Sequence, residues 1–300
     1  MSDLWLPKSF EDLEALPASD VISRQTIGLR AVVKTGPGVL IKYARDLAEE
    51  AICAQFALDE AALPVPRILY YPSDPHYVVT VQDLIAEQPL VISVWYFFME
   101  QVPGVSLDKV IDTMTVEELD HVAAQLKLLL LRMHTVQSKT LGFISGGPYR
   151  NTFFPLNISP ERSFTNVEEF IDHYRSLFTF IAGGNMDSVG HAYVDTLLSP
   201  FPRDCPMYFT HGDLLPKNIM VQGSTVTALI DWAEGGLYPE FWEYCRMHDR
   251  NFLTQAGRIY SRPYSLESVA PRTLTDWINC WTSSNIIYVD YQIIIFRARY

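Results

Sequence analysis

The chain has 300 residues, 48% of them hydrophobic, and could bury one large core or two smaller ones. Its formal net charge of −12 argues against a nucleic-acid partner and tolerates a cationic partner better than an anionic one, although the same excess also keeps ordinary proteins soluble. The four cysteines are scattered, and we expect them to be reduced. The sequence shows no secretory leader pattern, and its apolar runs are far shorter than the ~20 residues that span a bilayer. We therefore expect a cytoplasmic protein without membrane contact.

The first hundred residues predict several strands and one main helix. Residues 30–34 and 39–43 are β-branched runs on either side of the turn-forming tetrad Thr35-Gly-Pro-Gly38, which predicts a β-hairpin. A helical pattern follows at residues 46–58 and ends before two prolines. Further strands are expected at residues 67–71, 77–81 and 91–99.

The second half is predicted to be mainly helical. A long amphipathic helix is expected from Thr115 to about His134, and Glu118 completes a capping box at its start. Shorter helices are expected at residues 166–180 and 191–198. One exception is a small predicted hairpin, in which residues 219–221 and 227–230 flank a turn at residues 222–224.

Polar residues stand immediately before and after this small hairpin. His211, Asp213 and Asn218 fit the pattern H-x-D-x-x-x-x-N, and Asp231 follows the second strand. Enzymes that transfer phosphoryl groups in the manner of kinases use this pattern. Asp213 would accept or orient the proton of a hydroxyl nucleophile, while Asn218 and Asp231 would supply oxygen ligands to Mg²⁺. The hairpin is expected to bring Asn218 and Asp231 near each other.

The alternative interpretation is a simple turn followed by a surface acid. At average residue usage, the spacing of His211, Asp213 and Asn218 arises by chance in on the order of one chain in a hundred. The flanking sequence favours function, because a carboxylate directly after the apolar residues 227–230 lies at the edge of a core, where burial is costly.

Two segments resemble the signature segments of the aminoglycoside phosphotransferase family, namely His211-Gly-Asp-Leu-Leu-Pro-Lys-Asn-Ile-Met-Val221 and Ile230-Asp-Trp232. The segment Tyr238-Pro-Glu-Phe-Trp-Glu-Tyr244 is similar to one found in fungal members. The resemblance implies an α+β, bilobal, protein-kinase-like fold. Residues 1–101 would form a small antiparallel β-sheet lobe with one main helix that binds nucleotide, and residues 102–300 a larger, mainly helical catalytic lobe.

The same resemblance implies a small-molecule O-phosphotransferase that uses ATP and Mg²⁺ and acts on a hydroxyl. Asp213 would be catalytic, and Asn218 and Asp231 would hold the metal. Lys42 would bind the nucleotide phosphates and pair with Glu50, which fits the family better than Glu49. Lys34, on the preceding strand, is the rival lysine.

Residues 97–104 resemble the hinge between the lobes, where backbone groups of Glu100 and Val102 would hold adenine. No G-x-G-x-x-G phosphate loop is present. Ala233 stands where many relatives carry a glutamate, and Glu234 follows one place later. No family pattern is found after about residue 250, where residues 286–296 are apolar and β-prone. A catalytically silent nucleotide-binding or scaffold protein of the same fold is the alternative function.

Overall fold

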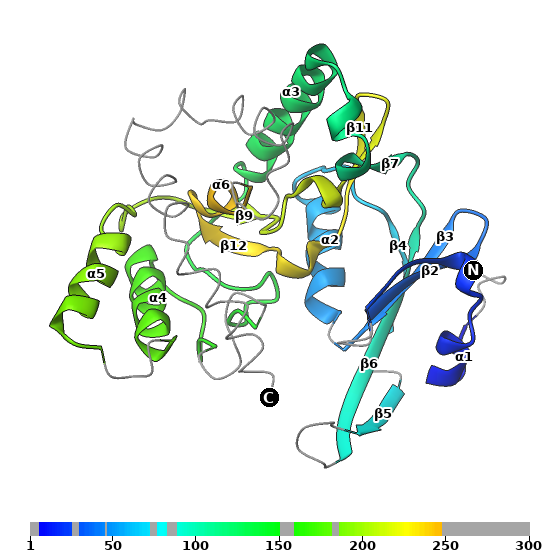
Figure 1. Ribbon diagram of the computed structural model, residues 1–300, viewed down its shortest axis with the longest axis horizontal. Helices are drawn as coiled ribbons and strands as arrows, with labels where there is room; N and C mark the ends of the chain where they lie inside the picture. The colour runs from blue at the N-terminus through cyan, green and yellow to red at the C-terminus, as the bar shows by residue number, and fades with distance from the viewer. Residues whose placement is uncertain are drawn as a thin grey trace.

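The computed structural model describes residues 6–25, 30–45, 47–72, 77–82, 89–150, 159–181 and 186–247. A sheet-rich part contains the N-terminal strands, and a mainly helical part follows it (Figure 1). The segment after residue 250 that lacks a family pattern, with its apolar stretch at 286–296, lies outside the described residues. Among the residues that the structure describes, no helix is both long and apolar enough to cross a membrane.

Within the described residues, the N-terminal sheet has six strands, all paired antiparallel, in the order β1-β2-β3-β6-β4, with β5 also paired to β6. A short helix, α1 (Phe10–Glu14), precedes it. The strands are β1 (Val21–Gln25), β2 (Arg30–Gly36), β3 (Val39–Ala44), β4 (Ile68–Tyr70), β5 (Tyr77–Gln82) and β6 (Pro89–Glu100). The sheet strands predicted from the sequence are therefore confirmed.

The hairpin of β2 and β3 determines which residues face the rest of the molecule. Its turn uses Gly38 at φ +72°, a left-handed conformation that glycine adopts readily. Val32 lies opposite Lys42 in the register, so both belong to one face of the sheet. The opposite face carries Val33 and Ile41, which are fully buried in a core with strand β6 and helix α1.

Helix α2 (Ala48–Asp59) connects the sheet to the helical part, and Figure 1 shows it between them. Cys53, Ala54 and Ala57 share a hydrophobic core with residues of the helical part. The contact is close at Gly235, because a Cβ there would lie 2.3 Å from the sulfur of Cys53. A larger residue at this position would push helix α2 away.

The helical part is built on α3 (Val116–Met133), with α4 (Val167–Ile181), α5 (Ser188–Leu198) and α6 (Trp242–Met247). The predicted capping box is present, since the Thr115 hydroxyl accepts from the amide of Glu118 and the Glu118 carboxylate accepts from the amide of Thr115. Helix α5 begins at Ser188, three residues before the predicted start at His191, because the side chain of Asp187 caps it. Figure 1 shows α4 and α5 side by side.

Two small sheets complete the helical part. Strand β10 (Ile219–Gln222) pairs with β11 (Thr225–Leu229), which confirms the predicted hairpin, and with β7 (Val105–Ser106). Strand β9 (Met207–Thr210) pairs with β12 (Gly236–Pro239) and β8 (Gln137–Ser138). Strand β6 ends at Glu100, and the next strand, β7, already belongs to the helical part. The lobe boundary after residue 101 stays a prediction.

Candidate active site

Lys42 connects the two parts of the molecule. Its ammonium lies 2.5 Å from a carboxylate oxygen of Glu50 on α2 and 2.8 Å from a carboxylate oxygen of Asp231, which is 189 residues further along the chain. Lys42 and Glu50 are each only 4% exposed. The rival Lys34 is exposed, and Glu49 accepts instead from the hydroxyl of Ser145. The structure thus brings Lys42, Glu50 and Asp231 together.

The two acids around Lys42 respond differently to their surroundings. Burial raises the pKa of Glu50, although the Lys42 ammonium opposes the shift. Burial alone would also raise the pKa of Asp231, but the positive charges of Lys42 and Arg30 outweigh it and hold that pKa below its ordinary value. Asp231 is therefore kept ionised, as a metal ligand must be.

We expect Asp231 to contribute to the acid sensitivity of the protein. Its pKa is lower in the folded chain than in the unfolded chain, where it is about 3.9. The ionised form therefore stabilises the fold above about pH 4, and this stabilisation is lost as the pH falls toward the folded-state pKa. In Asp231→Asn, the urea midpoint should fall less steeply between about pH 5 and pH 3 than in the wild type.

The matched control is Asp120→Asn, which alters an exposed acid on α3. In this variant, the urea midpoint should fall with decreasing pH as steeply as in the wild type. If the midpoint of Asp231→Asn fell equally steeply, the ion pairs of Asp231 would not stabilise the fold.

Asp213 lies in the loop after β9 and is held by three side chains. The ammonium of Lys217 is 2.8 Å from one carboxylate oxygen, and the Asn218 amide donates to the same oxygen at 2.9 Å. Arg246 on α6 is 3.4 Å from the other oxygen. The Asp213 side chain nevertheless remains 12% exposed. Its carboxylate is thus fixed in direction and still reachable.

The hydrogen bonds of His211 show that it supports this loop. Its Nδ1 accepts from the backbone amide of Asp213 at 3.2 Å, so that nitrogen carries no proton. Its Nε2, 3.0 Å from the carbonyl oxygen of Ile230, must then donate to that acceptor. The neutral ring, which is fully buried, therefore ties Asp213 to the residue that precedes Asp231.

Glu243 on α6 organises the backbone of the same loop. One of its carboxylate oxygens accepts from the amides of His211 at 2.6 Å and Gly212 at 3.0 Å, and the other accepts from the amide of Leu214 at 3.3 Å. Burial raises the pKa of Glu243 above its ordinary value, and the three backbone hydrogen bonds offset only part of this shift. All three bonds end on oxygens of Glu243, so this side chain fixes the backbone of the loop.

The two expected metal ligands lie at the open end of the β10–β11 hairpin. The backbone amide of Ile230 donates to the carbonyl oxygen of Asn218 at 2.9 Å, which places Asp231 next to this pair. Asp231 adopts a left-handed conformation, with φ +64° and ψ +66°, which turns the chain sharply after β11. Left-handed non-glycine residues are uncommon and often found at functional sites.

The donor set fits Mg²⁺. The Asn218 amide nitrogen bonds to two acceptors of Asp213, its carbonyl oxygen at 2.7 Å and a carboxylate oxygen, so Oδ1 is the atom left to face a metal. Within the described part of the chain, no group of three or more His, Cys, Asp or Glu residues could form a metal cage. Mg²⁺ does not require one, because it commonly binds one or two protein carboxylates together with phosphates and water.

The hinge residues lie where β6 ends. The amide of Glu100 donates to the carbonyl oxygen of Arg67, and the amide of Gln101 donates to the carbonyl oxygen of Gly38. The Glu100 side chain forms an exposed ion pair with Arg67 at 3.0 Å and therefore points to solvent. Val102 is half-buried just beyond the strand. No structural contact assigns adenine to Glu100 or Val102, so their role stays a prediction.

Four charged residues of the site were not predicted: Arg30, Lys217, Glu243 and Arg246. Lys217 stands inside the His211–Asn218 motif, and Glu243 inside the segment similar to fungal members, so both were visible in the sequence without an assigned role. Arg30 and Arg246 belong to no motif. Only the folded chain brings them beside Asp231 and Asp213.

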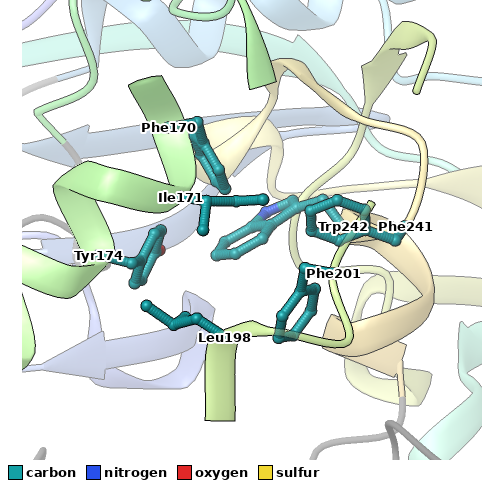
Figure 2. Close-up of a pocket in the computed structure, with 7 residues that line it drawn as sticks. All are labelled: Phe170, Ile171, Tyr174, Leu198, Phe201, Phe241 and Trp242. Carbon is teal, nitrogen blue, oxygen red and sulfur yellow. The ribbon is translucent and has the colours of Figure 1, made fainter. Parts of the chain in front are cut away.

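An apolar pocket lies in the helical part of the structure. It is lined by Phe170, Ile171, Tyr174, Leu198, Phe201, Phe241 and Trp242 (Figure 2). The same residues belong to the hydrophobic core formed by α4, α5 and α6. Among the described residues, none that lines the pocket carries a carboxylate or a positive charge, so we regard it as incomplete core packing and not as a site for phosphoryl transfer.

Comparison with known families identifies the fold. The model of the phosphotransferase enzyme family matches residues 18–265, which is more than half of the chain. The chain belongs to this family. It is a small-molecule O-phosphotransferase with the α+β, kinase-like fold, and the predicted family is confirmed, while the similarity to fungal members stays a prediction. Comparison with curated protein sequences gave no significant match.

Solved structures agree with this assignment at the level of fold. The phosphotransferase is similar to a thermostable mutant of aminoglycoside phosphotransferase APH(4)-Ia in its apo form, with 16% identity, a TM-score of 0.54, and coverage of 93% of this chain and 92% of the other. A ternary complex of such a mutant with AMP-PNP and hygromycin B gives 17% identity, a TM-score of 0.56, and coverage of 93% and 91%. The gentamicin complex of APH(2")-IIa gives 13% identity, a TM-score of 0.53, and coverage of 86% of this chain and 81% of the other.

Proposed function

We propose that this phosphotransferase uses ATP and Mg²⁺ to phosphorylate a hydroxyl group of a small molecule. The proposal rests on contacts between two sets of polar and charged residues that come from different parts of the chain. Lys42 and Glu50 of the sheet-rich part meet Asp231, and His211 and the β10–β11 hairpin tie Asp231 to Asp213 and Asn218. Phosphoryl transfer requires these functions in one place.

Each residue has a defined task in this proposal. Lys42, positioned by Glu50, binds the nucleotide phosphates, and Asn218 and Asp231 hold Mg²⁺, which neutralises negative charge on the phosphate oxygens. Backbone groups of Glu100 and Val102 hold the adenine ring at the hinge. Asp213 accepts a hydrogen bond from the acceptor hydroxyl and directs its oxygen at the γ-phosphorus.

The residues around Asp213 suit phosphoryl transfer through a loose transition state. Lys217 and Arg246 flank its carboxylate and fix it in place, so that it can orient the hydroxyl and take the proton late. Asn218 and His211 prevent the loop from turning away. The chain therefore contributes mainly by positioning and electrostatic stabilisation.

The relatives support the choice of ligands. The APH(4)-Ia mutant complexes contain hygromycin B with AMP-PNP in one case and with ADP in another. A nucleotide and a small-molecule acceptor are therefore bound together on this fold. The net charge of −12 favours a cationic acceptor here, and dependence on ATP favours a cytoplasmic location.

Thermal shift measurements test nucleotide binding. We expect ATP with Mg²⁺ to raise the melting temperature more than ATP alone, because a ligand at 100 times its Kd stabilises the fold by about 2.7 kcal/mol. The same experiment with AMP should give a smaller shift. No shift with any nucleotide would favour the scaffold alternative over the kinase.

A panel of acceptors tests the reaction itself. We expect release of ADP to accelerate with one or more hydroxyl-bearing amines, such as amino alcohols or aminoglycosides, and less with neutral sugars. Mass spectrometry of the acceptor should then show the mass of one added phosphoryl group. Stimulation by neutral sugars alone would contradict the expected cationic acceptor without affecting the nucleotide assignment.

A further inference from the structure

Arg30 lies on the same face of the sheet as Lys42. Val32 is opposite Lys42 in the β2–β3 register, and Arg30 is two residues before Val32, so the alternation of strand side chains gives all three the same face. A guanidinium nitrogen of Arg30 lies 3.9 Å from the carboxylate oxygen of Asp231 that does not bond to Lys42. Arg30 and Lys42 thus approach Asp231 from neighbouring strands.

The two cations are held in different ways. Lys42 makes short contacts with Glu50 and Asp231 and is almost fully buried. The Arg30 side chain is 33% exposed, and its 3.9 Å ion pair is too long for a hydrogen bond. The attraction is therefore electrostatic and leaves the planar guanidinium able to donate to another acceptor.

Arg30 lies at the end of a series of ion pairs. Its guanidinium is 3.9 Å from Asp231, and Lys42 joins Asp231 to Glu50. Arg30 partly neutralises a group of acids that would otherwise repel a nucleotide polyphosphate. Because its ion pair with Asp231 is too long for a hydrogen bond, the guanidinium can turn its N–H groups toward phosphate oxygens.

An arginine at this position would supply phosphate contacts that a glycine-rich loop provides in other kinase-like sites. Kinase-like sites often cover the phosphates with the backbone amides of a G-x-G-x-x-G loop, and this chain has no such sequence. An arginine can donate two parallel hydrogen bonds to one phosphate group. Strand β2 carries Arg30 directly beside the expected metal ligand Asp231, where the outer phosphates would lie.

We propose that Arg30 binds the outer phosphates of the nucleotide with two hydrogen bonds, in the place of a glycine-rich loop. This inference rests on the proposed function, because it requires that the site bind a nucleotide polyphosphate. On nucleotide binding, Arg30 would exchange Asp231 for phosphate oxygens, and the Asp231 carboxylate could then hold a metal ion. Lys42 and Arg30 then hold the phosphate chain from two neighbouring strands.

Equilibrium binding of ATP with Mg²⁺ and of adenosine tests the proposal with Arg30→Gln and Arg30→Lys. Arg30→Gln should weaken ATP binding by about 10- to 100-fold, the range for loss of hydrogen bonds to a charged group, and change adenosine binding by less than about twofold. Arg30→Lys should recover only part of the loss, because lysine cannot form the paired contact.

The matched control is Arg24→Gln on the neighbouring strand β1. Arg24 forms an exposed ion pair with Glu14 at 3.7 Å, so this variant should bind both ligands as the wild type does. If Arg30→Gln weakened ATP and adenosine equally, or neither, the proposal would be overturned while the kinase assignment stood. If the wild type itself failed to bind ATP, the proposed function would fall and the role of Arg30 with it.

Discussion

Asp213→Asn should lower kcat by about 10²- to 10⁴-fold while ATP with Mg²⁺ binds with nearly wild-type affinity. Asparagine has the same shape and can still accept a hydrogen bond, but it cannot take the proton of the acceptor hydroxyl. The nucleotide contacts proposed for Lys42, Arg30 and Asp231 remain in this variant. Turnover with the best acceptor and calorimetric titration of ATP measure the two effects separately.

Asp231→Asn provides the contrasting result. It should weaken binding of the metal nucleotide itself, because an amide is a poorer Mg²⁺ ligand than a carboxylate. Asp120→Asn, on the surface of α3, should change neither turnover nor binding. Full activity in both Asp213→Asn and Asp231→Asn would refute the assignment of the active site.

Glu243→Ala should have the largest effect on stability. Removing the carboxylate leaves the backbone amides of His211, Gly212 and Leu214 without their acceptor inside the protein. Each buried donor left unsatisfied costs about 1–3 kcal/mol, so the free energy of unfolding should fall by about 3 kcal/mol or more. Urea denaturation monitored by tryptophan fluorescence measures this loss.

Glu243→Gln separates a positioning role from a purely structural one, because glutamine keeps the shape but offers one acceptor oxygen instead of two. We expect kcat to fall several-fold with little change in KM for ATP, since the loop that moves carries Asp213 and not Lys42. Glu240→Gln, three residues earlier and half-buried, is the control. A stability loss in Glu243→Gln with unchanged kcat would leave Glu243 a structural residue only.

Local sequence patterns were sufficient for most of the secondary structure. The β2–β3 hairpin followed from two β-branched runs and a Pro-Gly turn, and α3 from its capping box and amphipathic pattern. The start of α5 was missed by three residues, because its polar first turn carries no apolar periodicity and only the Asp187 cap marks it. These features depend on residues within a few positions of each other, so sequence alone can indicate them.

The linear order also indicated which of the candidate site residues lie near one another. Asp213 and Asn218 are five positions apart, and a short hairpin separates Asn218 from Asp231, so their proximity follows from local geometry. The pairing of Lys42 with Glu50 is likewise local, since a strand leads directly into the helix that carries the acid. The family resemblance added the roles of these residues.

Contacts between distant segments came only from the folded chain. Lys42 and Arg30 approach Asp231 because of the way α2 packs against the turn at Trp232–Glu234. The hydrogen bonds from the Asp213 loop to Glu243 depend on the position of α6. Periodicity shows which face of an element is polar, but it does not show which distant charge that face will meet. That choice is made by packing of the apolar faces, which brings the charged edges of separate elements to common positions.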